Sequence, residues 1–430
     1  MGQRFISFLG MVLITSVAWL FSKQKKEISW PTVFWGFLLQ LIIGVIVFLV
    51  PISRQFFLYF NQIFLIVLQA ANEGIRFVFG PLSVSPGESG SPGFILAFQV
   101  LPVVVFFSAL SAALYYLHLL QPVVQFFARI FRWVMGLSGA EALAGAANIF
   151  VGVESALVVR PYLEAMTRSE LAMLLACGMA TVASSTLGMY VSLLSPVFPG
   201  IAGHLFSASI LSIPAAGVIS KILVPETERP LTLGSVPKEI NERRASSFMA
   251  SLVDGSQDGL RLTAYIAALL IALLGLLHLL DQGIAIVGKW LKLPWPISLT
   301  LFLQGIFYPF AAVLGIHPAD IPLAAKLLGE RVLLTEVVPY QQLAQLAAKA
   351  AFSDPRSIVI LSYALCGFTH IASIAIFVGG TAALAPSRRN ELAWLGPIAL
   401  LAATLATLMT GCVAGIFCGN EGILLGNSLP

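Results

Sequence analysis

The chain has 430 residues, of which 58% are hydrophobic and only 10% are charged, and its mean hydropathy is +0.92. This composition leaves no room for a soluble domain of useful size and indicates a polytopic membrane protein. The net charge of +4 is small and the basic residues are spread over short loops, which argues against nucleic acid as a partner. The four cysteines show neither metal-site nor disulfide spacing, so we interpret them as packing residues.

Eight segments are apolar enough to cross a hydrocarbon core of about 30 Å, which takes about 20 helical residues. We therefore predict an all-α protein with about eight transmembrane helices, at 5–22, 33–50, 94–118, 169–194, 205–222, 260–280, 357–380 and 393–416. The first of these is interpreted as a span and not as a signal peptide, because it lacks a small-residue cleavage site. Four further segments are apolar but interrupted, at 52–80, 119–136, 138–163 and 284–345. Residues 121–133 have the helical spacing of apolar and basic residues that suits a helix lying in the membrane interface.

The segment 138–163 places Glu154 and Arg160 among apolar residues. A charge at membrane depth is costly unless it is paired or faces a polar cavity, so these residues mark a candidate site. The apolar runs on either side of Gly152 are too short to span the bilayer. We therefore predict a re-entrant hairpin whose tip is buried in protein or lines water.

The distribution of basic residues predicts the sidedness of the loops. Lys and Arg occur after odd-numbered spans, whereas the loops at 80–93 and 196–204 and the tail after Phe417 have none. This asymmetry predicts that both termini lie outside and that the hairpin 138–163 opens from the cytoplasm. The basic residues on the predicted cytoplasmic side are Lys23, Lys25, Lys26, Arg129, Arg132, Lys238, Arg243, Arg244, Arg388 and Arg389.

The two halves of the sequence share a pattern of residues. Residues 148–162 and 326–340 each contain a glycine, then a glutamate, then Pro-Tyr, and each is followed by a span rich in small and hydroxylic residues. By the same count of spans the second hairpin enters from outside, so we expect an inverted repeat. Such repeats place the substrate and the coupling ion near the midplane, where broken helices meet.

These patterns divide the chain into five expected parts. Residues 1–136 form N-terminal scaffold helices and the interfacial helix, and residues 137–223 form the first repeat, with hairpin 138–163. Residues 224–317 contain the polar loop, a scaffold helix at 260–280 and an interfacial segment. Residues 318–416 form the second repeat, with hairpin 318–345, and residues 417–430 form an external tail.

Several motifs, in the right order along the chain, resemble the concentrative nucleoside transporter family. They are Asn148-Ile-Phe-Val-Gly152, Arg160-Pro-Tyr-Leu with Met166-Thr-Arg-Ser-Glu170, Gly178-Met-Ala-Thr-Val182, Leu327-Leu-Gly-Glu with Thr335-Glu336, and Cys366-Gly-Phe368. The resemblance implies a homotrimer in which a transport domain of two hairpins and two broken helices shifts like an elevator against a scaffold. It also implies a bacterial inner membrane, since the extended N-terminal region of animal members is missing.

The resemblance also implies which residues form the site. Family substrate contacts correspond to Glu154, Glu336, Phe368 and Ser373; carboxylates and a hydroxyl suit ribose hydroxyl groups, and an aromatic ring packs on a flat sugar or base. The family cation site corresponds to carbonyl and hydroxyl oxygens, which suit a hard monovalent cation at an unwound helix. Its expected ligands are Asn148, Val151, Thr181, Val182 and Ser185. The coupling ion is sodium or a proton, and no other cofactor is expected.

The chain departs from the family pattern at three places. The first hairpin tip reads Gly152-Val153-Glu154, without the Gln and Thr that contact the nucleobase in the family. His370 replaces a ribose-contacting Asn and adds a group that titrates near neutral pH, and Thr335 replaces the Asn before the second glutamate. Val153 and His370 therefore complete the expected substrate site, and the nucleobase preference is open.

Simpler roles compete with these assignments. Glu154 and Glu336 can pair with Arg160 or Arg331 to hold the hairpins, His370 can be a packing residue, and the hydroxyl side chains can serve interhelical hydrogen bonds. Glu170 belongs to a capping box at the start of a span.

Three functions follow from the sequence. A cation-coupled nucleoside symporter in the lipid bilayer is favoured. A transporter of similar architecture for a modified nucleoside or another polar solute is the alternative. A sensor or enzyme is the weakest reading, because no catalytic motif stands out.

Overall fold

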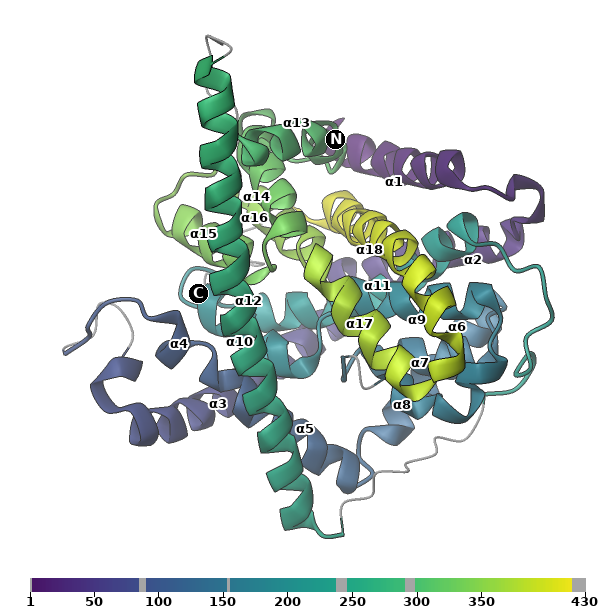
Figure 1. Cartoon of the computed structure of the whole chain (residues 1–430), viewed down its shortest axis with the longest axis horizontal. Helices are drawn as coiled ribbons and strands as arrows, with labels where there is room; N and C mark the ends of the chain where they lie inside the picture. The colour runs from purple at the N-terminus through teal and green to yellow at the C-terminus, as the bar shows by residue number, and fades with distance from the viewer. Residues whose placement is uncertain (1, 85–89, 153–154, 237–245, 291–297, 420–430) are drawn as a thin grey trace.

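The computed structural model describes residues 2–84, 90–152, 155–236, 246–290 and 298–419. Within these ranges the ordered elements are α-helices and short 3-10 turns, and no strand occurs there (Figure 1). Eight helical segments are long and apolar enough to cross a membrane. The predicted all-α membrane fold is therefore confirmed.

The N-terminal part contains α1 (Gly2–Phe21), α2 (Trp30–Leu49), α3 (Pro51–Phe79), α4 (Leu96–Gln99) and α5 (Pro102–Tyr116). The expected interruption at 52–80 is wrong, because α3 is one unbroken helix. Its proline stands at the first helical position, where the missing N–H costs nothing. Polar residues such as Asn61 lower the hydropathy of α3 without breaking it, and Asn61 bonds Pro199 and Ala202 at the start of α11 (Ile201–Leu223).

The first repeat has the predicted break in its central span. After α6 (Gln121–Met135) come α7 (Gly139–Asn148) and the short α8 (Ser155–Val158), which correspond in sequence to the two sides of the predicted hairpin. The span predicted at 169–194 is divided into α9 (Arg168–Ala180) and α10 (Ser184–Leu194). Between them the backbone is extended at Thr181 and Ala183.

The second repeat follows the same order of elements. It begins with α14 (Ile321–Leu333) and α15 (Val337–Ala348), continues with α16 (Pro355–Ala364) and α17 (Ile371–Leu384), and ends with α18 (Arg389–Phe417). The span predicted at 357–380 is therefore two short helices. The eight segments of spanning length include Gln55–Ser83 in its place. The shared order, a helix pair, a broken helix and a long helix, agrees with the predicted internal repeat, and the opposite orientation of the repeats stays a prediction.

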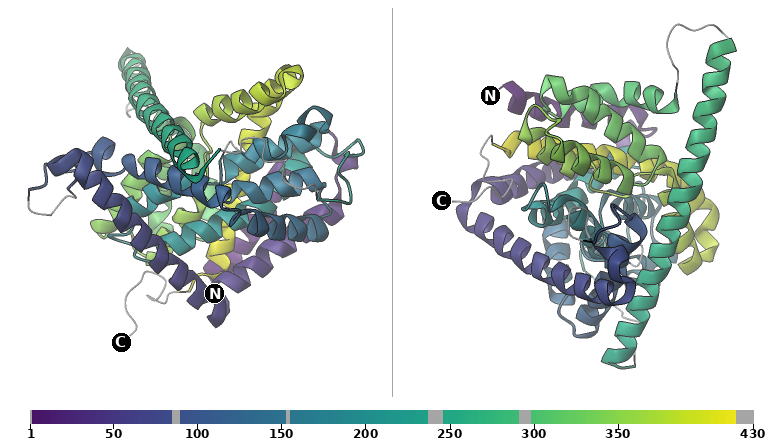
Figure 2. Two further views of the ribbon diagram at one scale, coloured as in Figure 1. Left: turned by 90° about the horizontal axis from the view of Figure 1, so that it is seen from below. Right: turned by 90° about the vertical axis from the view of Figure 1, so that its left-hand side faces the viewer.

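Between the repeats lie α12 (Phe248–Trp290) and α13 (Leu299–Val313). The prediction of a span at 260–280 was too short, because α12 has 43 residues. Its first turns carry Asp254, Gln257 and Asp258, which lower the hydropathy, yet no proline interrupts the helix. Figure 2 shows α12 running along the outside of the molecule and extending beyond the neighbouring helices.

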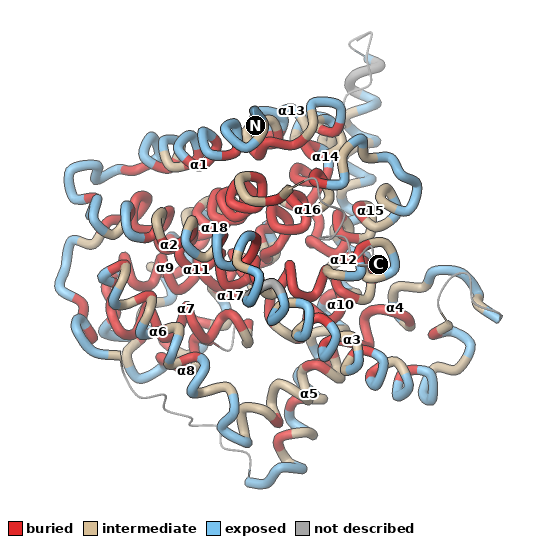
Figure 3. Tube along the Cα trace, turned by 180° about the vertical axis from the view of Figure 1, so that it is seen from behind, coloured by how far each residue is buried: buried red, intermediate tan, exposed pale blue. Residues whose placement is uncertain are grey.

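The core is built from the repeats. In α9–α10 and in α11, 94% of the residues in the apolar 18-residue stretch are buried inside the protein, compared with 11% in α12. Figure 3 shows the same contrast, with buried residues concentrated along α7, α9, α11, α16 and α18. The breaks at 181–183 and 365–370 thus lie in a packed environment, where irregular backbone in a membrane protein is tolerated.

A buried polar cluster joins the ends of α7, α9 and α11. Capping boxes begin α7, with Ser138 and Glu141, and α9, with Thr167 and the predicted Glu170. The Ser138 hydroxyl donates to Glu170 at 2.5 Å, and Lys221 on α11 lies 2.5 Å from Glu141. Because these charges are paired and hydrogen-bonded, they hold the base of the first hairpin to the core.

Candidate substrate and cation site

Side chains from three elements meet around the carboxylate of Glu336. Glu336 lies between α14 and α15 and is 2% exposed. Tyr190 on α10 donates its hydroxyl to Oε1, and Nε2 of His370, at the start of α17, lies 3.2 Å from Oε2. The first and second repeats therefore contribute side chains to one buried polar site.

The hydrogen bonds of His370 fix the position of its ring proton. Nδ1 accepts from the Ser373 backbone N–H at 3.2 Å and thereby caps α17, while the Ser373 hydroxyl donates to the His370 carbonyl at 2.6 Å. An accepting Nδ1 leaves the proton of the neutral ring on Nε2, the atom that faces Glu336. Sequence analysis placed both residues in the substrate site, and the structure brings them together with Glu336.

One oxygen of Glu336 has no hydrogen-bond donor among the described residues. The His370 contact meets the distance of an ion pair but not the geometry of a hydrogen bond, so Oε2 remains unsatisfied. The hydroxyls of Thr335 and Thr369 are also buried without a hydrogen-bond partner in the described part of the chain. Buried polar atoms are normally hydrogen-bonded, so a cluster of unsatisfied ones suits a polar ligand.

The helix geometry adds to this polarity. Glu336 and His370 are the N-cap residues of α15 and α17, so the N-terminal ends of both helices face the site. Helix N-termini carry partial positive charge, which stabilises a carboxylate and favours ligand oxygen atoms.

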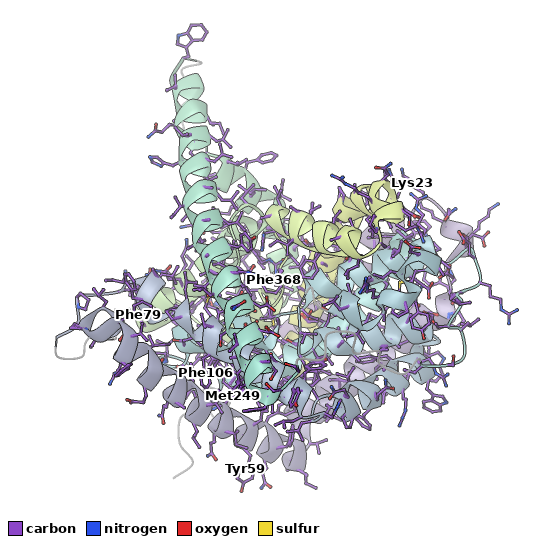
Figure 4. All side chains as sticks on the ribbon, turned by 60° about the horizontal axis from the view of Figure 1, so that its bottom comes forward. Lys23, Tyr59, Phe79, Phe106, Met249 and Phe368 are labelled. Carbon is purple, nitrogen blue, oxygen red and sulfur yellow. The ribbon has the colours of Figure 1, made fainter. Side chains whose placement is uncertain are left out.

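Aromatic rings border the carboxylate. The rings of Tyr190 and Tyr340 stack with their centroids 4.5 Å apart. Phe368 is only partly buried, and its ring lies 6.4 Å from that of His370 in an edge-on arrangement; Figure 4 labels it near the middle of the molecule. Phe368 is thus placed to pack on a planar ligand group. The predicted residues Val153 and Glu154 lie outside the described residues.

The expected cation ligands come from two segments that the structure joins. The backbone N–H and the hydroxyl of Ser184 both donate to the Phe150 carbonyl, which links the end of α7 to the break between α9 and α10. Asn148 is fully buried, and its Oδ1 accepts from Ser155 at 3.0 Å. The segments carrying Val151 and Thr181 therefore approach each other at this link.

Oxygen atoms among the expected cation ligands can accept further contacts. The Thr181 hydroxyl donates to the Cys177 carbonyl, which leaves its oxygen free to accept. Among the described residues, the Val182 carbonyl receives one long contact of 3.5 Å, from Ser209. Hydroxyl, amide and carbonyl oxygens of this kind fit a monovalent cation. Ser185 is buried beside them at the start of α10.

Sequence analysis missed the residues that hold the broken helix α16. The carbonyls of its last turn are bonded by side chains from other helices: Tyr340 donates to Ser362, Thr410 to Tyr363, and Arg331 to Ala364. A positive charge at a helix C-terminus is favourable. Arg331 therefore caps α16, and the ion-pair contact of Glu336 is with His370 and not with Arg331. The Pro-Tyr of the second repeat was the one sequence signal for Tyr340.

Comparison with known sequences covers most of the chain. The family models described as "Na+ dependent nucleoside transporter N-terminus", "Nucleoside recognition" and "Na+ dependent nucleoside transporter C-terminus" match residues 9–82, 97–197 and 204–415. Nucleoside permease NupC of Helicobacter pylori is 31% identical over 96% of this chain and 97% of its own length. Solute carrier family 28 member 3 of Mus musculus is 36% identical over 96% of this chain, which spans 59% of that relative's length.

Solved structures give the same result. CNTnw in an inward-facing substrate-bound state has a TM-score of 0.86 and 33% identity, covering 96% of this chain and 99% of that one. A CNTnw variant in an intermediate state has a TM-score of 0.88 with 33% identity, covering 96% and 98%. Because these relatives are more than 30% identical to the chain over nearly their whole length, the chain belongs to the concentrative nucleoside transporter family.

Proposed function

We propose that this protein is a cation-coupled symporter that imports nucleosides across the plasma membrane, with the substrate bound at Glu336. The observation that carries the proposal is the buried, unsatisfied Oε2 of Glu336 between two helix N-termini. A ribose hydroxyl would donate to this oxygen, and Phe368 would pack on the sugar or base. His370 would present its Nε2–H to the same group.

The coupling ion is sodium or a proton. The oxygens of Asn148, Val151, Thr181, Val182 and Ser185 suit sodium, and the matching family models are described as Na+ dependent. His370 offers a proton-binding group near the substrate. In the part of the chain that the structure describes, no group of three or more His, Cys, Asp and Glu side chains is arranged to hold a metal ion.

We propose an elevator-type mechanism. A cation first binds beside the Phe150–Ser184 link and orders the first hairpin. The substrate then donates hydrogen bonds to the buried Glu336 carboxylate and so offsets its charge. A closed, neutralised transport domain crosses the membrane at lower cost, and preference of both ligands for that state supplies the coupling. We propose a homotrimer in a bacterial inner membrane as the functional assembly. The mobile unit would comprise 137–223 and 318–416, and the scaffold the other helices.

A second substrate class stays open. The first hairpin tip lacks the family's Gln and Thr, and His370 stands where the family has Asn. These changes favour a modified nucleoside or another polar solute carried by similar architecture.

Uptake into proteoliposomes tests both readings. Radiolabelled uridine and adenosine are supplied with an imposed sodium gradient, a proton gradient or neither. Accumulation that needs one gradient identifies the symporter and its ion. Glu336→Gln is expected to abolish uptake while the oligomer measured by light scattering is unchanged, because the amide replaces a carboxylate acceptor by a donor. Normal transport by this variant would contradict the site assignment, and no uptake by the folded wild-type protein under any gradient would favour the second substrate class.

A further inference from the structure

Two cationic side chains lie against the ring of one exposed tryptophan at an end of the helix bundle. The Arg168 guanidinium carbon lies 3.9 Å and the Lys23 ammonium nitrogen 5.5 Å from the ring centroid of Trp394. The three residues come from the α1–α2 loop, the start of α9 and the second turn of α18. Trp394 remains 46% exposed, and Figure 4 labels Lys23 beside the yellow ribbon near α18.

Neither cation has a carboxylate partner within ion-pair distance among the described residues. A neighbouring basic residue behaves differently. Arg388 lies 2.6 Å from Glu391 and donates to the carbonyls of Glu164 and Met166. The charge of Arg388 is therefore balanced within the protein, whereas those of Lys23 and Arg168 are left for an external anion.

The cluster lies at the ends of three helices of spanning length. The helix α1 ends at Phe21, α9 begins at Arg168, and the α18 span begins at Pro386. Tryptophan is typical of the membrane–water interface, where phospholipid headgroups are found. The N-termini of α9 and α18 add partial positive charge at this level. An anion at this cluster would thus be at headgroup depth.

Apolar surface continues from the cluster toward the membrane. Leu20 and Phe21 in the last turn of α1 are 64% and 62% exposed, two or three residues from Lys23. A free phosphate ion would gain nothing from these side chains, whereas an acyl chain would pack on them.

We propose that Lys23, Arg168 and Trp394 form a binding site for the headgroup of an anionic phospholipid. The lipid phosphate lies between the two cations, Trp394 contacts the glycerol region, and an acyl chain runs along Leu20 and Phe21. A bound lipid joins the α1–α2 loop to the starts of α9 and α18. Basic pockets between transmembrane helices bind anionic headgroups in this way.

Native mass spectrometry of the purified, delipidated protein tests the site. The protein is titrated with dioleoyl phosphatidylglycerol or dioleoyl phosphatidylcholine, and bound lipid is counted. A Lys or Arg near the membrane surface contributes about fivefold in affinity for anionic lipid, so Lys23→Gln with Arg168→Gln should weaken the tightest phosphatidylglycerol site about thirtyfold. Phosphatidylcholine binding should not change.

Lys25→Gln with Lys26→Gln is the matched control, because it removes the same total charge, from the loop that carries Lys23, and leaves the cations at Trp394 in place. A control variant that loses as much phosphatidylglycerol as the test variant would overturn the proposal, as would equal binding of both lipids by the wild type. Glycerol phosphate, which has the anion but no acyl chain, should not displace the lipid at millimolar concentration. Displacement would identify a simple anion site instead, and would equally overturn it.

Discussion

At the scale of single residues, the site depends on the chemistry of His370. Its Nδ1 accepts the hydrogen bond that caps α17, and its Nε2 faces Glu336. Loss of the Nδ1 acceptor would leave the Ser373 N–H at the start of α17 without its cap. Loss of Nε2 would remove the one polar group of His370 that faces the Glu336 carboxylate.

We therefore expect His370→Ala to weaken uridine binding, because it removes both the cap of α17 and the Nε2 atom that faces Glu336. His370→Asn should retain more affinity than His370→Ala, since Asn is a good N-cap acceptor. Equilibrium binding to the detergent-solubilised protein, without any gradient, measures both affinities. Equal affinities of the wild type and His370→Ala would contradict the placement of His370 in the substrate site.

At the scale of helices, α12 approaches α5 closely at two glycines. A Cβ at Gly259 would lie 2.7 Å from the Val105 Cα on α5, and one at Gly255 would lie 2.8 Å from the Ser108 carbonyl oxygen. The spacing Gly-xxx-Gly lets two membrane helices approach closely. Side chains added there meet backbone, which cannot move aside as a flexible side chain can.

Gly259→Val should therefore destabilise the protein by about 1–3 kcal/mol, the usual cost of overpacking a well-filled contact. Gly275→Val on the same helix is the control, because a Cβ there meets nothing within 4 Å. Thermal unfolding in detergent compares the two variants. Both replace glycine by valine in the same helix, so the change in helix propensity is the same and the difference in transition temperature reports the packing. Equal transition temperatures would mean that α12 does not depend on this contact.

Sequence reasoning reached the order of the elements but not their extents. The small and hydroxylic residues that gather in α9–α10 and α16–α17 indicated the breaks there. Hydropathy failed for α3 and for the first turns of α12, where polar residues lower hydropathy but keep the helix. Tyr190 and the capping role of Arg331 were missed, because a hydrogen bond across 146 residues and a guanidinium that caps another helix leave no local pattern.

At the scale of the whole molecule, the fold gathers segments that the charge pattern predicted to share one side of the membrane. Lys23 and Arg168 meet at Trp394, and Arg388 contacts Glu164 and Met166 at the end of the first hairpin. These contacts join three loops predicted to be cytoplasmic. The loop at 80–93 is predicted to lie opposite.

Cysteine labelling tests this topology with little background, because all four native cysteines are buried. A membrane-impermeant maleimide added to intact cells should label Pro92→Cys but not Lys26→Cys or Arg389→Cys, and inverted vesicles should give the reverse. All three positions are exposed in the structure, so their accessibility differs only through the membrane. Labelling of Lys26→Cys and Pro92→Cys from one side would place the two loops together and would remove the basis for an inverted repeat, since the second hairpin would then no longer be assigned to the face opposite the first.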